Sequence, residues 1–415
     1  MSRPPVEVAD ILHAQGDRFV EQNGSWLGIQ RLSVLRAITR CRTAALGGHI
    51  DHCPLCGHQA ISYNSCRNRH CPKCQAQARQ RWLAAREKEV LGVPYFHVVF
   101  TIPHELNPLC QYNPEVLYGL LFQASAATLL EVAADPKHLG AEIGFLSILH
   151  TWGQNLLRHP HAHCVIPAGG FSPDRTRWLH PRYPFFLPLK VLSRVFRGKF
   201  IAGLRRAFRQ NKLRFHGALA SLQNPQQFAA FLRTVFRQDW VVYAKPAFGG
   251  PTQVLRYLGR YTHRVAISNH RILAFDGARV TFRWKDYAHG SKQRKMTLSA
   301  SELLGRFAQH ILPCGFVRIR QYGFLANRCR AASLALGRQL LAITPQAQQP
   351  CPENAGNATG WRCPKCGAAM QMGVNLTAAT SQIDANSSTA PSQPTKVSRR
   401  RATARRRTGV LMPPK

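Results

Sequence analysis

Six of the thirteen cysteines lie within one short stretch, from Cys41 to Cys74. Cys53 and Cys56 form one C-x-x-C pair, and Cys71 and Cys74 form a second. Such a pair lets two thiolates reach one tetrahedral ion at about 2.3 Å from a single tight turn. No secretory signal opens the sequence, so clustered pairs indicate metal sites in a reducing compartment instead of disulfides. The spacing predicts a small module that is held together by zinc.

Four further candidate ligands lie near the two pairs, which makes eight in all; the four are Cys41, His49, Cys66 and His70. Eight ligands would make two closed tetrahedral sites, and closed sites are structural. We therefore predict about two structural Zn²⁺ ions. The sequence does not assign ligands to ions, and Cys41 and His49 could instead be a buried thiol and a surface imidazole. Near the other end, Cys363 and Cys366 form half a knuckle, with Cys351 as a candidate third ligand. The predicted N-terminal ligands are Cys41, His49, Cys53, Cys56, Cys66, His70, Cys71 and Cys74.

The charge of the chain predicts a polyanionic partner. Lys and Arg number 56 against 19 Asp and Glu, which gives a net charge of +37. Such a surplus opposes compaction and usually matches nucleic acid. No uninterrupted apolar run reaches the roughly 18 residues that a spanning helix needs, so we expect no membrane partner. The charge alone does not separate DNA from RNA, and the basic run around the cysteines at residues 65–81 predicts phosphate contacts there too.

The hydrophobic pattern predicts an α+β fold. Strand-like runs cover Pro94–Ile102, Gly144–Trp152 and Ala162–Ile166, and Asp276-Gly277 predicts a hairpin. Helical patterns occupy residues 1–45, where Ile29, Leu32, Leu35 and Ile38 are spaced for one apolar face. Further helices are expected at residues 75–91, 114–134, 187–213, 226–237 and 251–262, and a short strand at 239–243.

A second metal site is predicted at His161-Ala162-His163. Residues i and i+2 of a strand point to the same side, so both imidazoles can bind one divalent ion. His150 lies on the preceding predicted strand, and a hairpin would bring it beside His163 as the third ligand. Gln154 is the alternative.

Two tyrosines share a helical face in the segment RYLGRYTHR. Tyr257 and Tyr261 are four residues apart, and Arg256, Arg260 and Arg264 form a stripe beside them. Phenols at the border of a basic face suit attack on phosphate, although two amphipathic tyrosines could also simply cap a core. In the following hairpin, Trp284 and Lys285 are candidate DNA-binding residues, with core packing as the alternative for the aromatic ring.

Three stretches carry a specific resemblance: HTWGQNLLRHPHAHCVIPAGG, RYLGRYTHRVAISN and YNSCRNRHCPKC. They resemble the signatures of the two-tyrosine HUH transposases of the insertion sequence 91 family, and they occur along the chain in the order expected for that family. The resemblance covers roughly residues 30–330. The resemblance implies that His161 and His163 bind the catalytic metal and that Tyr257 and Tyr261 are nucleophiles. It also implies that the cysteine cluster is the family's N-terminal zinc-binding domain.

The resemblance implies a transposase that cleaves and rejoins single-stranded DNA through a 5′-phosphotyrosine, for rolling-circle transposition. Mg²⁺ or Mn²⁺ would serve catalysis. The chain has no P-loop motif, so a host helicase or the replication machinery would separate the strands. The expected location is the bacterial cytoplasm, at the nucleoid. A replication initiator or relaxase would use the same residues, whereas a non-catalytic zinc protein that binds DNA or RNA would not need the tyrosines.

These expectations define a domain plan. A helical segment (1–45) leads into the zinc-binding domain (41–92), and the HUH domain (93–330) has a central antiparallel sheet flanked by helices. A C-terminal segment (331–373) carries the half knuckle. The remainder (374–415) is poor in apolar residues and ends in a run of arginines, which is typical of a disordered tail.

Overall fold

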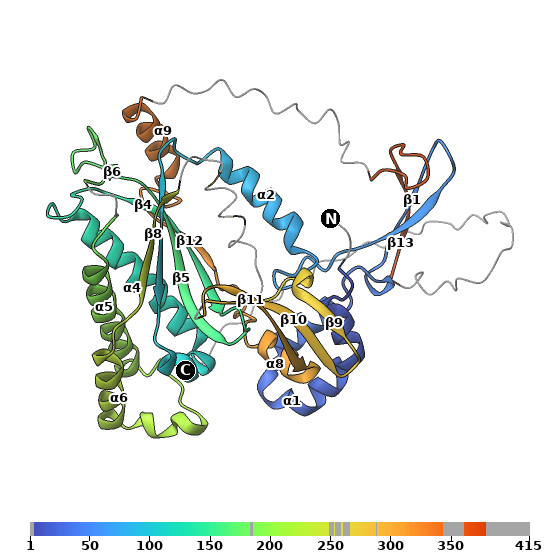
Figure 1. Ribbon diagram of the computed structural model, residues 1–415, viewed down its shortest axis with the longest axis horizontal. Helices are drawn as coiled ribbons and strands as arrows, with labels where there is room; N and C mark the ends of the chain where they lie inside the picture. Colours follow the sequence, from blue (N-terminus) through green and yellow to red (C-terminus); the bar gives the residue numbers. More distant parts are fainter. Residues whose placement is uncertain are drawn as a thin grey trace, which may run out of the picture.

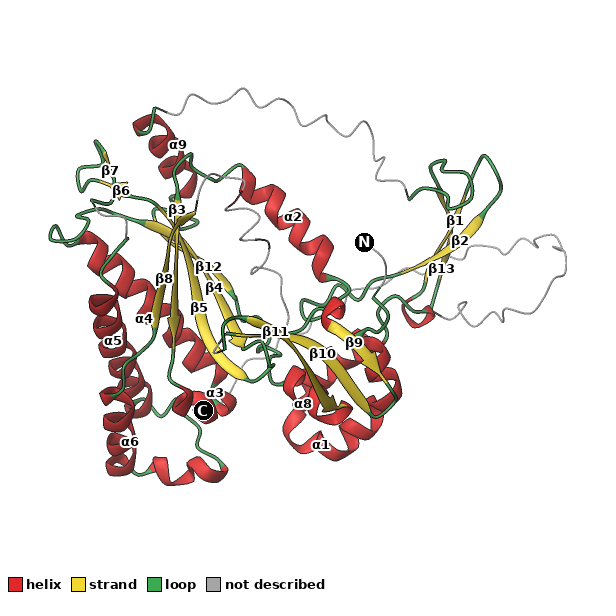
Figure 2. Cartoon of the chain, viewed as in Figure 1, coloured by secondary structure: helices red, strands yellow, loops and turns green. Residues whose placement is uncertain are grey.

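The computed structural model describes residues 4–182, 186–248, 266–287, 289–342 and 361–378, together with Gln253 and Gly259. The fold is mixed α+β, and its strands pair antiparallel throughout the described residues (Figures 1 and 2). The expected α+β class is therefore confirmed. Most of the predicted helix at 251–262 lies outside the described residues, as does the tail beyond Ala378.

A five-stranded sheet in the order β12-β4-β5-β3-β8 forms the centre of the larger lobe. Its middle strands are rich in β-branched and aromatic residues, which suits strands covered on a buried face. The hairpin predicted from the sequence is present, because β4 and β5 are neighbours joined by a short turn. The strands are β3 (Tyr95–Thr101), β4 (Gly144–Trp152), β5 (Arg158–Pro167), β8 (Val242–Phe248) and β12 (Ile319–Gly323).

Two long helices, α4 (Pro114–Ala134) and α5 (Leu189–Arg209), cover one face of this sheet, and a shorter helix, α6 (Pro225–Arg237), packs against α5 (Figure 1). All three are close to the predicted ranges. Among the described residues only α4 is long and apolar enough to cross a membrane by length and composition. Its side chains instead pack on Phe100, Ala162 and their neighbours in the main core, which accounts for its hydropathy.

Among the described elements, two helices cover one end of the opposite face. There α2 (Gln75–Glu87) and α9 (Arg330–Leu340) pack on Leu146, Ile148 and Val165. The two-stranded ribbon of β6 (Gly170–Phe171) and β7 (Trp178–Leu179) adds Phe171 and Trp178 to this smaller core. The far end of the same face is the end that carries the histidines of β4 and β5.

A second lobe joins the start of the chain to its later half. Helix α1 (Val8–Thr39) packs with α8 (Ala300–Ala308) against the sheet of β9 (Ile272–Phe275), β10 (Arg279–Asp286) and β11 (Lys292–Ser299). The predicted hairpin turn is confirmed: Asp276 Oδ1 accepts hydrogen bonds from the backbone N–H groups of Ala278 and Arg279, and Gly277 has φ +95°.

One detail of α1 contradicts the predicted apolar face. Leu35 and Ile38 are buried, but Ile29 is 89% exposed. All four residues follow Gly28, which has φ +63° and interrupts the helix. Each step of three residues turns an α-helix by about 300°, so Ile29 lies about 180° around the helix from Ile38 and cannot share its buried face.

A third, small sheet has the order β13-β1-β2. It consists of β1 (Gly48–His52), β2 (Gln59–Tyr63) and β13 (Gln371–Leu376), so its strands come from both ends of the chain (Figure 1). The remaining elements are α3 (Asn107–Tyr112) and 3₁₀ turns at Ala44–Leu46, His104–Leu106, Gly217–Gln223 and Asn269–Arg271.

Candidate active site and zinc-binding cysteines

Three histidines meet at the other end of this face of the central sheet. His150 on β4 stands directly opposite His161 on β5, and His163 lies two residues further along β5 on the same face. One ligand nitrogen from each ring can be chosen such that all three lie within 4.8 Å of one another. The arrangement predicted for His150, His161 and His163 is therefore present in the fold.

Hydrogen bonds orient two of these rings. His161 Nδ1 is 2.6 Å from the carbonyl oxygen of His159, and a carbonyl only accepts, so Nδ1 carries the hydrogen. Nε2 of His161 is thereby left with its lone pair, as a metal ligand requires. His163 Nδ1 is 2.8 Å from Nε2 of His97, a residue of β3 that the sequence reasoning missed. Its only sequence signal was a histidine inside an otherwise apolar strand.

Burial keeps the imidazoles of His161, His163 and His97 neutral. His150 and His163 are 4% and 6% exposed. Desolvation lowers the pKa of His161 to about 3 and holds the pKa of His163 well below its usual range, and neighbouring histidines add to the second shift. The pKa of His97 also falls to about 3, through burial first and then the charge of Lys245. Neutral nitrogens with lone pairs are the form in which histidine binds metal.

Aromatic packing holds the ring of His150 in place. The ring of Trp152 stacks on it at 4.6 Å between centroids. His310 lies beyond Trp152 and is held by two hydrogen bonds: its Nε2 donates to the carbonyl of Leu156, and Thr151 Oγ1 lies 3.1 Å from its Nδ1. Gln154, the alternative third ligand, sits in the β4–β5 turn, where its carbonyl accepts a hydrogen bond from Arg271.

The two predicted nucleophiles, Tyr257 and Tyr261, lie outside the described residues, as do Arg256, Arg260 and Arg264. Gly259, between the tyrosines in sequence, is described. It is helical and buried, and a Cβ there would approach Leu83 Cδ1 to 2.9 Å and Arg79 Cδ to 3.8 Å. Leu83 and Arg79 belong to α2, so α2 packs against Gly259, which lies between the two tyrosines in the sequence.

The hairpin residues proposed for DNA binding have mixed surroundings. Trp284 on β10 is half-buried against the core of the second lobe, and Phe282 beside it is fully buried. Lys285 lies over the ring of Tyr287 at 5.2 Å, and that ring is 63% exposed. Trp284 and Lys285 are therefore both partly buried, whereas Arg283 and Tyr287 are exposed.

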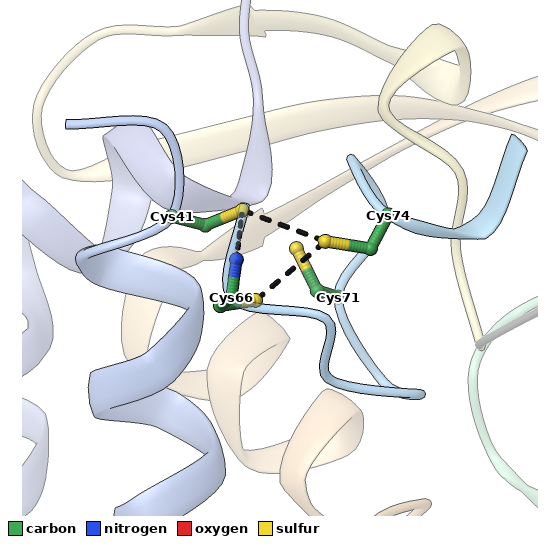
Figure 3. A group of neighbouring side chains, drawn as sticks. All are labelled: Cys41, Cys66, Cys71 and Cys74. Carbon is green, nitrogen blue, oxygen red and sulfur yellow. Dashed lines mark hydrogen bonds between the residues drawn. The ribbon is translucent and has the colours of Figure 1, made fainter. Parts of the chain in front are cut away.

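Four cysteines gather where α1 ends and α2 begins (Figure 3). The sulfurs of Cys41 and Cys66 lie 3.6 and 3.7 Å from that of Cys74, and Cys71 completes the group. These separations are far beyond a disulfide bond of about 2.05 Å. They match the roughly 3.8 Å between ligands of a regular tetrahedron with metal–sulfur bonds of about 2.3 Å. The group contacts the core of the second lobe and is therefore integral to it.

A second group of four joins distant parts of the chain. Cys53 Sγ is 3.4 Å from Cys366 Sγ, and Cys56 Sγ is 3.5 Å from Cys363 Sγ. The N-terminal knuckle and the C-terminal half knuckle thus complete one another. Cys351, the predicted third partner of that half knuckle, lies outside the described residues.

Neither cysteine group includes His49 or His70. His49 pairs instead with Asp51, at 3.3 Å. His70 is 4% exposed, and its Nε2 accepts a hydrogen bond from the backbone N–H of Leu312. Arg69 donates to the carbonyls of Pro313 and Phe316, so this loop docks the cysteine module onto the later half of the chain. Sequence spacing alone could not separate a docking histidine from a ligand.

Comparison with known proteins links these sites to one family. A model described as "Transposase zinc-binding domain" matches residues 11–102, and another described as "Putative transposase" matches residues 144–333. The first range contains the cysteine group at the α1–α2 junction. The second contains the three histidines and the tyrosine segment.

Two curated proteins are similar over most of their length. The "Putative transposase y4qJ" of Sinorhizobium fredii is 53% identical over 347 residues, which cover 84% of this chain and 87% of the relative. The "Transposase for insertion sequence element IS801" of Pseudomonas savastanoi pv. phaseolicola is 28% identical over 354 residues, covering 80% of each. No solved structure matches the chain.

Proposed function

Because this chain belongs to the insertion sequence 91 family of transposases and has an N-terminal zinc-binding domain, we propose that it cleaves and rejoins single-stranded DNA by tyrosine transesterification. The reaction would serve rolling-circle transposition of an insertion sequence. The observation that carries the proposal is the group of His150, His161 and His163 on two adjacent strands. Zinc binding by the N-terminal domain rests on the family match and on the cysteine groups.

The donor set of the histidine site suits a divalent ion that keeps open positions. Three imidazole ligands leave room for oxygen atoms of a substrate. A bound Mg²⁺ or Mn²⁺ would polarise the scissile phosphate and offset the charge that develops on its oxygens. The chain's own contribution is orientation: the His159 carbonyl holds His161, His97 contacts His163, and Trp152 stacks on His150.

In the proposed reaction, Tyr257 or Tyr261 attacks a backbone phosphate. The bond from phosphorus to the tyrosine oxygen forms as the bond from phosphorus to the 3′ oxygen breaks. The phenol loses its proton, and the released 3′ oxygen gains one. Since one phosphodiester replaces another, no nucleotide cofactor is consumed. The sequence-adjacent Arg256, Arg260 and Arg264 are the proposed phosphate contacts, together with Lys285 on β10. Trp284 on the same strand is the proposed stacking partner of a base.

Two tyrosines suit two successive strand transfers, one at the element end and one at the target. The surplus of basic residues, +37 overall, fits a substrate of repeated phosphates. DNA of the element ends is therefore the proposed substrate. A host helicase or replication supplies its single-stranded form in this proposal, because the sequence has no P-loop motif.

The direct test of this function uses the full chain and a labelled single-stranded oligonucleotide of an element end. With Mg²⁺ or Mn²⁺ present, we expect a covalent protein–DNA adduct and a shorter strand with a free 3′-hydroxyl on a denaturing gel. A chelator for divalent metal, or the same sequence as a closed duplex, should prevent the adduct. Cleavage that leaves no covalent adduct at any time would contradict a tyrosine nucleophile.

For the first cysteine group, we propose that Cys41, Cys66, Cys71 and Cys74 bind a structural zinc ion. Cys41 and Cys71 are fully buried beside the core of the second lobe, so the double change Cys41→Ser and Cys71→Ser should lower both zinc content and stability. We expect one zinc fewer per chain and a loss of several kcal/mol, since zinc binding contributes about 10–16 kcal/mol in small zinc-finger peptides.

Metal analysis and thermal unfolding measure these two effects. Cys314→Ser is the matched control, because Cys314 is an exposed cysteine outside both groups. The control should keep the zinc content and the unfolding temperature of the parent chain. An unchanged zinc content in the double variant would exclude this group as a ligand set.

A further inference from the structure

We propose that Cys53, Cys56, Cys363 and Cys366 form a second zinc site, which clasps the C-terminal segment 361–378 onto the N-terminal module. The zinc-binding family model covers residues 11–102 and therefore contains only half of this ligand set. The other half is more than 300 residues away in sequence, at sequence separations of 307 and 313 for the two close sulfur pairs.

The sulfur geometry fits one ion. Each of the four residues offers a sulfur within 4.8 Å of the others, and the cross-knuckle pairs are 3.4 and 3.5 Å apart. A regular tetrahedron of sulfurs at about 2.3 Å from zinc has edges of roughly 3.8 Å. The sulfurs are thus near ligand spacing, and none of these cysteines is in a disulfide.

The two knuckles have the same sequence pattern and the same backbone geometry. Each reads Cys-Pro-x-Cys-Gly, at residues 53–57 and 363–367. In each, the N–H of the first cysteine donates to the carbonyl five residues later, and the N–H of the glycine donates back to the first cysteine. The glycines have φ +68° and +76°, a left-handed conformation that favours glycine. Two matching turns that aim their thiols at one point make a built metal site.

In the described part of the chain, these cysteines stand where strand pairing and a very small apolar core join the two segments. Strand β13 pairs with β1, and a Cβ at Gly47 would meet the carbonyl of Leu376 at 2.4 Å, so these backbones approach very closely. The accompanying core has only Cys53, Cys363 and Met370 buried, with Ala60 and Ala368 beside them. A core this small does not stabilise a domain by itself, and such modules usually depend on a metal.

The clasp has a consequence for the basic C-terminus. The described chain ends at Ala378, beside Gly47, close to the end of α1. The sequence that continues from there contains eight Lys and Arg from Lys396 to Lys415. The second zinc site thereby holds the last described residues, which precede this basic sequence, next to the N-terminal module. In this site Cys56 and Cys366 are exposed, so it should lose its ion before the core-embedded group does.

Competitive alkylation of the purified, zinc-loaded full chain tests the site without any mutation. A brief treatment with N-ethylmaleimide should label the exposed Cys314 first. Cys56 and Cys366 are exposed as well. We nevertheless expect them, together with Cys363, to react at least about tenfold more slowly than Cys314 until a zinc chelator is added. Mass spectrometry of peptides reads each position. Labelling of Cys363 and Cys366 at the rate of Cys314 would overturn the proposal, and so would labelling that requires a reductant instead of a chelator.

A variant distinguishes zinc binding from simple shielding. Cys363→Ser with Cys366→Ser should lower the zinc content by one ion per chain relative to the parent, whereas Cys314→Ser should not. Amide exchange should speed up at the β1 residues that pair with β13 and stay unchanged in β4. A double variant that keeps the full zinc content would place the ligands elsewhere. Because these readouts do not involve DNA cleavage, they can fail or succeed independently of the proposed strand transfer.

Discussion

The double variant Tyr257→Phe, Tyr261→Phe is expected to form no covalent adduct with single-stranded DNA, while its affinity for that DNA stays within about twofold of the parent. Each change removes one oxygen and keeps the ring, so the nucleophile is lost but packing and charge are preserved. A twofold change corresponds to about 0.4 kcal/mol, within the range of mild substitutions. Denaturing gels measure the adduct, and fluorescence anisotropy measures the affinity.

The single variants separate the roles of the two tyrosines. Each should lose complete transposition, although one of them should keep partial nicking; we expect Tyr261 to make the first cut. Tyr243→Phe is the matched control: Tyr243 is 50% exposed and pairs with Val99, which in turn pairs with His163, so it lies on the same face of the sheet. Two strand spacings, about 10 Å, separate it from that histidine. An adduct that maps to Tyr243, Tyr287 or Tyr322 would overturn the assignment of the nucleophiles.

The second large effect is expected at the histidine site. His161→Ala removes a proposed metal ligand from a partly exposed strand position, so DNA cleavage should fall by more than about 100-fold, beyond what losing an outer-shell partner costs. The unfolding temperature should change little. His163→Ala should be as inactive, but this change could also lower stability, because His163 is buried and contacts His97. Single-turnover kinetics measure the loss of DNA cleavage, and calorimetric titration with Mn²⁺ measures the loss of metal affinity that should accompany it.

The neighbouring His159 gives the control for this experiment. It is on the same strand and forms its own His-x-His pattern with His161, but its side chain is exposed and is not part of the three-histidine group. His159→Ala should therefore keep both cleavage and Mn²⁺ affinity. Normal cleavage in the double variant His161→Ala, His163→Ala would mean that the catalytic metal binds elsewhere.

Local patterns in the sequence were sufficient for much of the fold. The strands β3 and β4, the helices α4 and α6 and the hairpin at Asp276 follow from periodicity and turn residues, which act over a few neighbours. His161 and His163 could be placed on one face for the same reason, because strand geometry fixes where residues i and i+2 point. Ile29 shows the limit: a strict three-residue spacing drifts around the helix by about 60° at each step, so the first and last of four such positions face opposite sides, and Ile29 is exposed while Ile38 is buried.

The sequence by itself determined which residue types were available for metal and where each lay along its own element. Only the tertiary structure decided which of them meet. Cys53 pairs with Cys366 across a sequence separation of 313, and His97 reaches His163 from a different strand. His70 has ligand spacing but is turned to the backbone of Leu312. Spacing in the sequence constrains atoms within one turn or one strand. Contacts between distant segments depend on how the whole chain packs, so the sequence around one Cys-x-x-Cys turn does not indicate which other turn completes its metal site.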